Sequence, residues 1–302
     1  MQNKNLKFVF FGTPDVARDT LEILKENGYM PSLIVTSSDK KQGREMILTP
    51  PPVKIWAEKN NIPYIQPENT KELGVVFATS SQADEPRKAI RQQADMRESK
   101  NDTQFDLSIV VAYGKIIPEN ILNIPKLGSI NIHYSLLPKY RGASPVESAI
   151  LNGDTETGVT IQKMKYEIDS GNIIMQEKVN IFPDEKAQDL RKRLIKIGGE
   201  LLVKTLPDFI NVETKETTQN ENEAIFCKKI KKEDGLLDLN DDPIKNYNKF
   251  RAYATWPRTF FFQNNKRIII TDAMLENKQL IIKKVLPEGR KEIKYEDFLR
   301  IS

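Results

Sequence analysis

The run Leu107-Ser-Ile-Val-Val-Ala112 decides the fold of the first half of the chain. A continuous apolar run of this length is typical of a central strand in a parallel sheet, because helices cover both faces of such a strand. Leu6–Phe11 has the same character, and Ile130–His133 follows as a further strand. We therefore expect an α/β domain built on a doubly wound, mostly parallel sheet.

The segments around the first strand continue this alternation of strands and helices. Gly12-Thr-Pro14 predicts a turn into a helix, with Thr13 as its cap and Pro14 at its first position. The elements expected next are a strand at Leu33–Ser37, a polar loop at Asp39–Pro52, a short helix around Ile55 and Trp56, and a strand at Ile62–Gln66. Neither glycine-rich nucleotide motif, G-x-G-x-x-G or G-x-x-x-x-G-K-[ST], occurs, so the open end of the sheet should hold another kind of ligand.

The second half of the chain is divided by a polar segment. Asn172–Ile181 predicts a strand, and Asp184–Phe209 predicts a long helix with one leucine-rich side. Asn211–Glu223 is polar and low in complexity, which marks a linker. Beyond it the pattern predicts a helix at Pro243–Tyr253 and strands at Arg258–Phe262, Arg267–Thr271 and Leu280–Val285, as in a small OB-like β-barrel. We expect domains at 1–210 and 224–302, joined by a linker at 211–223.

The composition is that of an ordinary globular protein with room for two domains: 302 residues, of which 39% are hydrophobic and 29% charged. Cys227 is the only cysteine, which excludes an internal disulfide and a cysteine-rich zinc site and fits a reducing compartment. With a single histidine as well, we expect no metal. The first apolar run is too short for a signal peptide, and no stretch approaches ~18 apolar residues. We expect a cytoplasmic monomer without a membrane segment.

Positive charge is concentrated near the end of the chain. Residues 224–302 contain 17 Lys+Arg against 11 Asp+Glu, a charge of +6, whereas the whole chain carries +4. Such a basic region is a candidate surface for a polyanion. The alternative is an ordinary lysine-rich face that only contacts solvent.

Two short motifs contain the candidate chemical groups. Asn131-Ile-His133 includes the only histidine of the chain, and Asp169-Ser-Gly171 adds a carboxylate. Asn131 and His133 are two residues apart in an expected strand, so their side chains project from the same face. A hydrogen-bond donor and a proton-transfer group would then share one cleft. The alternatives are a structural histidine and an aspartate that only stabilises a turn.

These motifs resemble the signature of the formyltransferases that use 10-formyltetrahydrofolate. The resemblance rests on Asn131-Ile-His133, on Ser135-Leu-Leu-Pro-Lys-Tyr-Arg-Gly142 and on Asp169-Ser-Gly171. Further matching stretches are Phe11-Gly-Thr-Pro14, Gly43-Arg44, Pro52-Val-Lys54, Val111-Ala-Tyr-Gly114, Gly153-Asp-Thr-Glu-Thr-Gly-Val-Thr160 and Trp256-Pro257. Within that group the chain most resembles the enzymes that formylate methionyl-tRNA. The resemblance implies a Rossmann-like catalytic domain followed by a domain that binds tRNA.

The resemblance also implies roles for individual residues. Asn131 would polarise the formyl oxygen, His133 would stabilise the developing oxyanion and move a proton, and Asp169 would orient His133 and assist deprotonation of the amine. The implied folate-binding residues are Ser135, Leu136, Leu137 and Pro138, with Val111, Ala112, Tyr113 and Gly114. The residues expected to contact initiator methionyl-tRNA are Arg44, Lys228, Lys229, Lys231 and Lys232.

The chain departs from the family pattern at three places. Tyr134 stands where a small residue or proline is usual, the loop that starts at Asp39 lacks the usual arginine and proline, and Gly74–Gln104 is a longer insertion than expected. Other acceptors remain open, namely an amino sugar nucleotide or a purine precursor. A non-enzymatic RNA-binding protein is a further alternative, although all three polar residues of the proposed mechanism are present.

Overall fold

The computed structural model describes residues 6–43, 45–69, 72–73 and 105–300. Arg44 and the 74–104 insertion lie outside these residues. The chain forms two compact units that interleave along the sequence. The first unit comprises Met1–His133, Thr160–Gln176 and Ile195–Gln219, and the second comprises Tyr134–Val159, Glu177–Leu194 and Asn220–Ser302.

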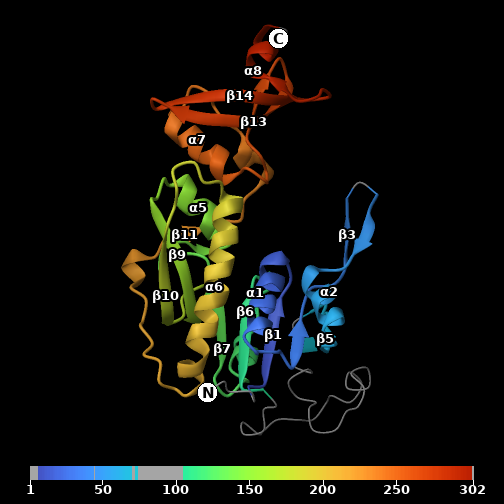
Figure 1. The fold of residues 1–302 in the computed structure, drawn as a ribbon, viewed down its shortest axis with the longest axis vertical. Coiled ribbons are helices and arrows are strands. Elements are labelled where there is room, and N and C mark those ends of the chain that lie inside the picture. The colour runs from blue at the N-terminus through green and yellow to red at the C-terminus, as the bar shows by residue number, and fades with distance from the viewer. Residues whose placement is uncertain (1–5, 44, 70–71, 74–104, 301–302) are drawn as a thin grey trace. The chain divides into compact units, whose positions relative to one another are not determined.

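A seven-stranded sheet runs in the order β10-β9-β7-β6-β1-β2-β5 (Figure 1). Its strands are β1 (Phe8–Gly12), β2 (Leu33–Val35), β5 (Tyr64–Ile65), β6 (Leu107–Val111), β7 (Ser129–His133), β9 (Glu156–Lys163) and β10 (Ile173–Asn180). The pairs from β5 through β2, β1 and β6 to β7 are parallel, and β9 is antiparallel to β7. The chain adds strands on one side of β1 and then on the other, which confirms the doubly wound, mostly parallel sheet.

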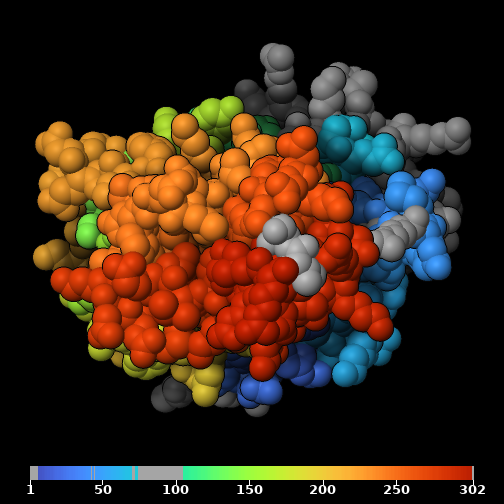
Figure 2. Space-filling view, turned by 90° about the horizontal axis from the view of Figure 1, so that it is seen from above, coloured from blue at the N-terminus to red at the C-terminus, as the bar shows by residue number. Residues whose placement is uncertain are grey.

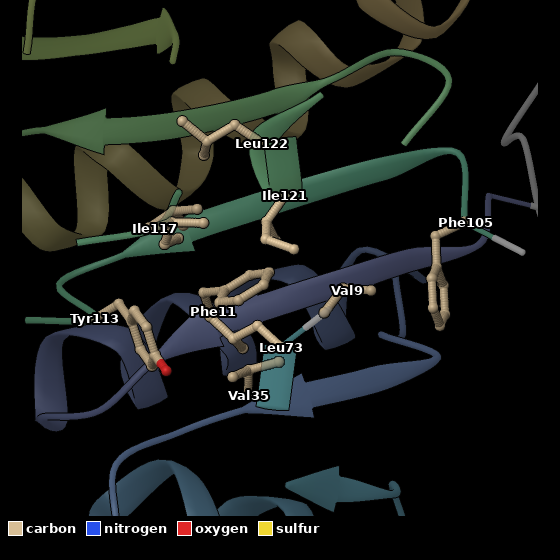
Figure 3. Packing of buried hydrophobic residues seen from close by; sticks show 10 residues of the cluster. Val9, Phe11, Val35, Leu73, Phe105, Tyr113, Ile117, Ile121 and Leu122 are labelled. Atoms are coloured by element: carbon tan, nitrogen blue, oxygen red, sulfur yellow. The ribbon is translucent and has the colours of Figure 1, made fainter. Parts of the chain in front are cut away.

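Burial explains why β1 and β6 lie at the centre of this sheet. Every residue of both strands is buried. Val9 and Phe11 pack with Val35, Val110 and Tyr113 in one apolar cluster, where the rings of Phe11 and Tyr113 meet edge-on at 5.4 Å (Figure 3). Truncating Phe11 to alanine should lower the free energy of unfolding by about 3–5 kcal/mol.

Helices α1 (Asp15–Glu26), α2 (Pro52–Lys59), α4 (Glu119–Leu122) and the second half of α6 (Ala187–Ile210) belong to the first unit. The expectation that Thr13 caps α1 is wrong, because the helix starts later and Pro14 is its N-cap residue. Thr13 Oγ1 instead donates to the carbonyl oxygen of Tyr113 at 3.2 Å. This bond joins the end of β1 to the segment that follows β6.

The stretch 39–52, expected to be a loop, contains a hairpin of β3 (Lys40–Gln42) and β4 (Ile47–Thr49). The expectation is wrong because strands of three residues are too short to show a periodic pattern. Asp39 anchors the base of the hairpin by accepting hydrogen bonds from Gln66 Nε2 at 2.7 Å and from Lys54 Nζ at 2.7 and 2.9 Å. The Gln66 bond, and then the Lys54 bond, lower the pKa of Asp39.

The polar segment 211–223, expected to be a linker, makes specific contacts with the rest of the first unit up to residue 219. Thr217 pairs with Ile173 in an isolated β-bridge. Glu216 accepts hydrogen bonds from Lys163 Nζ at 3.0 Å and from Asn172 Nδ2 at 2.9 Å. A polar composition is compatible with such packing because backbone and side-chain groups satisfy one another.

The second unit contains a smaller antiparallel sheet in the order β12-β13-β14-β15. The four strands of this sheet are β12 (Phe260–Gln263), β13 (Lys266–Glu276), β14 (Gln279–Pro287) and β15 (Ile293–Lys294). The other helices and strands of the second unit are β8 (Arg141–Gly142), α5 (Pro145–Leu151), η2 (Glu221–Glu223), β11 (Phe226–Cys227), η3 (Lys232–Gly235), α7 (Pro243–Ala252) and α8 (Tyr295–Arg300). Phe250, Phe261 and Phe298 share its apolar core. Figure 2 shows the residues of this unit in space-filling form, with the last part of the chain in orange to red. Across the described ranges, no helix has the length and apolar character needed to span a membrane.

Candidate active site

The candidate site starts from the pairing of β7 with β9. Asn131 lies opposite Gln162, and His133 lies opposite Thr160. Directly opposed residues of an antiparallel pair project from the same face of the sheet. The strand pairing therefore places an amide, an imidazole, a hydroxyl and a second amide on one face.

His133 and Asp169 come together as the sequence predicts. The distance between His133 Nδ1 and Asp169 Oδ2 is 3.6 Å, and the two side chains are 7% and 18% exposed. A carboxylate beside Nδ1 favours a proton on that nitrogen, so the neutral imidazole presents Nε2 as its proton acceptor. This arrangement suits general base catalysis.

Gln162 joins the remaining polar groups of this face. Its Nε2 donates to Asn131 Oδ1 at 3.1 Å and to Asp169 Oδ1 at 2.9 Å. The residue is 2% exposed, and its Oε1 has no hydrogen-bond partner among the described residues. An unpaired buried acceptor costs about 1–3 kcal/mol. Gln162 was not predicted from the sequence, although its position two residues after the matching stretch that ends at Thr160 is a signal that could have identified it.

The amide of Asn131 is held from a second side. Its Nδ2 donates to the Val110 carbonyl oxygen on β6 at 2.9 Å. A side-chain amide has two N–H protons, and the second has no acceptor among the described residues. Asn131 can therefore offer one directed donor to a ligand.

A tight turn positions Asp169. The residue has a φ of 51°, in the left-handed region that aspartate tolerates better than most residues. Gln219 Nε2 donates to the Asp169 carbonyl oxygen at 2.8 Å and to that of Gly171 at 2.6 Å. A Cβ at Gly171 would lie 1.6 Å from the Lys163 carbonyl oxygen, so only glycine fits there. Gln219 is a second residue that was not predicted, because the polar sequence around it indicated a linker.

Comparison with known proteins gives the site its context. Residues 5–206 match the formyl transferase family, and residues 229–280 match the formyl transferase C-terminal domain. A methionyl-tRNA formyltransferase from Geobacter metallireducens is 36% identical over 97% of this chain and 95% of its own length. The chain belongs to the methionyl-tRNA formyltransferase family. It is an enzyme that transfers a one-carbon group.

Other members and solved structures agree with this assignment. A methionyl-tRNA formyltransferase from Thermotoga maritima is 39% identical over 87% of this chain and 77% of its own length. The structure of the one from Clostridium thermocellum is 17% identical, has a TM-score of 0.58 and covers 93% of this chain and 98% of its own. WlaRD, a sugar 3N-formyl transferase solved in the presence of dTDP and 5-N-formyl-THF, is 22% identical, has a TM-score of 0.64 and covers 90% of this chain and 87% of its own. Both structures share the fold of this formyltransferase.

The predicted folate-binding residues fall in both units. Val111 ends β6, and Ala112 has a left-handed φ of 47°. Tyr113 is buried in the apolar cluster of the first unit, and this burial raises its pKa to about 12. In the second unit, Ser135 is buried and its Oγ donates to the Lys139 carbonyl oxygen at 2.5 Å. Leu136, Leu137 and Pro138 follow it, with Leu137 buried.

The predicted tRNA-binding residues in the second unit are exposed. Lys228, Lys229, Lys231 and Lys232 have no ion-pair partner within 4.0 Å in the part of the chain that the structure describes. The other predicted contact, Arg44, lies outside that part. Within the same ranges, no group of three or more His, Cys, Asp or Glu residues could hold a metal ion.

Proposed function

We propose that Asn131, His133 and Asp169 catalyse transfer of the formyl group of 10-formyltetrahydrofolate to the α-amine of initiator methionyl-tRNA. The observation that carries this proposal is the set of contacts that brings the three side chains together. His133 Nδ1 lies 3.6 Å from Asp169 Oδ2, and Gln162 donates hydrogen bonds to both Asn131 and Asp169. The family assignment supplies the reaction, and these side chains supply groups suited to it.

The first task of the site is to hold the amine in a reactive state. An α-amine has a pKa of about 8, so most of it is protonated at neutral pH and cannot attack a carbonyl carbon. Asp169 sets the imidazole of His133 with Nδ1 protonated, and Nε2 then takes the proton of the attacking amine. The partly buried carboxylate also stabilises the imidazolium that results. The imidazolium then gives its proton to N10 of the folate as the tetrahedral intermediate breaks down and tetrahydrofolate leaves.

The second task is to stabilise charge on the formyl oxygen. 10-Formyltetrahydrofolate supplies an electrophilic formyl carbon, and negative charge grows on its oxygen when an amine attacks. Asn131 has one N–H proton without an acceptor in the described chain, as a donor to this oxygen requires. A single such donor contributes roughly 100- to 1,000-fold to turnover. The residues present therefore fit a formyl donor.

The remaining assignments are extensions of this proposal. Val111–Gly114 and Ser135–Pro138 bind the folate, while Arg44 and the four exposed lysines bind tRNA phosphates. We assign catalysis to a domain at 1–210 and tRNA binding to one at 224–302, which the matches at 5–206 and 229–280 support. A cytoplasmic monomer suits an aminoacyl-tRNA substrate and a sequence with a single cysteine.

A direct competition of substrates tests the function. The full chain is incubated with 10-formyltetrahydrofolate and, separately, with methionyl-tRNA, an amino sugar nucleotide or a purine-precursor amine. Formylation of methionyl-tRNA with a kcat/KM at least 100-fold above the other two is the expected result. Preferred formylation of either small amine would contradict the proposal. Uncharged tRNA, which lacks the amine, is the matched control.

A further inference from the structure

Gln162 occupies a position that the proposed mechanism does not use. It is an uncharged, buried side chain whose two N–H protons are both engaged, one by Asn131 and one by Asp169. Its carbonyl oxygen has no partner among the described residues. The two residues it joins have different proposed roles, since Asn131 binds the formyl oxygen and Asp169 orients His133.

The hydrogen bonds between these groups can form in only one direction. An ionised carboxylate accepts hydrogen bonds and donates none, so Asp169 Oδ1 requires the NH2 end of Gln162. That NH2 group then requires an acceptor from Asn131, which must present Oδ1 and not Nδ2. Asn131 Nδ2 is consequently turned toward the Val110 carbonyl oxygen, 2.9 Å away.

We propose that Gln162 is a positioning residue through which the charge of Asp169 fixes the orientation of the Asn131 amide. The same bond fixes Oδ1 of Asp169 while Oδ2 faces His133 Nδ1. One carboxylate thus sets both the proton position on the imidazole and the direction of the oxyanion donor. This inference rests on the proposed roles of the three catalytic residues.

Two substitutions separate this role from ordinary packing. Gln162→Met keeps the length of the side chain and removes both N–H donors, so Asn131 and Asp169 lose their link. Gln162→Glu keeps the shape and offers only acceptors when ionised, so the Asn131 amide should turn over and direct Nδ2 away from the formyl oxygen. Gln176→Met is the matched control, because Gln176 lies on the neighbouring strand β10 and donates to Thr160 Oγ1 at 2.9 Å.

The expected kinetic result is a loss of kcat with little change in KM. Gln162→Met should lower kcat by about 10- to 100-fold, less than deletion of an oxyanion donor, and Gln162→Glu should lower it by about 100-fold or more. KM for methionyl-tRNA and for the folate should stay within about 2-fold of the wild-type values. The Gln176→Met variant should keep both parameters. A kcat within 2-fold of wild type for either Gln162 variant would overturn the proposal.

A spectroscopic readout tests the link without any substrate. His133 is the only histidine, so protein labelled with ¹⁵N-histidine gives one imidazole to follow by NMR at a pH where the ring is neutral. Wild-type protein should show Nδ1 as the protonated nitrogen, and Gln162→Met should shift both nitrogen signals toward a tautomer mixture. Unchanged signals in a folded variant would also overturn the proposal. If wild-type protein fails to formylate methionyl-tRNA, the proposed function is wrong, and the imidazole signals still decide the role of Gln162.

Discussion

The face of β7 and β9 and the basic segment 228–232 are both polar, but their side chains are held differently. On the first, hydrogen bonds of 2.9–3.1 Å connect buried and partly buried groups, and each of these bonds has a defined donor and acceptor. In the second, four lysine side chains are exposed to solvent. Chemistry on a reacting atom requires the first arrangement, because small misplacements reduce catalysis strongly. Attraction of a polyanion requires only a suitable density of charge.

The largest effect on turnover should come from the three residues proposed to be catalytic. His133→Ala should lower turnover by about 100-fold or more while folate binding changes little, because general acid–base groups contribute about that much. Asn131→Ala and Asp169→Ala should behave alike. Steady-state kinetics and equilibrium folate binding measure the two effects. The triple variant should lose less than the product of the single losses, because the residues act as a unit. Near-normal turnover in any single variant would remove that residue from the mechanism.

The turn that holds Asp169 should be nearly as sensitive. Gly171→Ala forces a Cβ toward the Lys163 carbonyl oxygen, so the turn must shift and Asp169 with it. We expect the free energy of unfolding to fall by about 1–3 kcal/mol, measured by urea denaturation, together with a loss of kcat. The control is Ser170→Ala, which removes only one hydrogen bond to the Glu167 carbonyl oxygen. Equal stability and turnover in the two variants would show that the turn accommodates the methyl group.

A change in the hairpin of β3 and β4 should have a smaller effect on activity than the changes above. Arg44 lies between these strands in sequence, and Arg44→Ala should lower kcat/KM for methionyl-tRNA by about 10-fold through loss of a charged hydrogen bond of about 1.5–3 kcal/mol. Protease cleavage within the hairpin should slow when tRNA is added. The control variant is Lys25→Ala on α1. An unchanged kcat/KM would make the hairpin a passive connection.

The basic segment should give the smallest effect per residue. Replacing Lys228, Lys229, Lys231 and Lys232 together should weaken tRNA binding and flatten its dependence on salt, by a slope of about 0.7–0.9 for each lost phosphate contact. Binding titrations at several salt concentrations measure the slope. Replacement of Lys192 and Lys196, two exposed lysines of α6, should leave the slope unchanged. If the four replacements also leave it unchanged, tRNA contacts another surface.

Much of the fold could be predicted because short stretches of the sequence show the apolar patterns of buried strands and helices. The apolar runs of β1 and β6 indicate strands buried on both faces, and the structure confirms them. The hairpin of β3 and β4 was not predictable, since its exposed three-residue strands have no apolar side. The contacts of Thr217 and Gln219 were missed for a related reason, because they satisfy partners that are distant in the sequence.

The sequence by itself determined the central strands, the residue types of the candidate site and the family. It did so because burial requires apolar runs and the proposed chemistry requires Asn131, His133 and Asp169 as residue types. Only the tertiary structure decided how these groups are oriented. Asn131 and Gln162 are 31 residues apart in the chain and become neighbours through the pairing of β7 with β9. The direction of a hydrogen bond depends on which donor and acceptor atoms lie next to each other. The register between β7 and β9 decides which atoms those are.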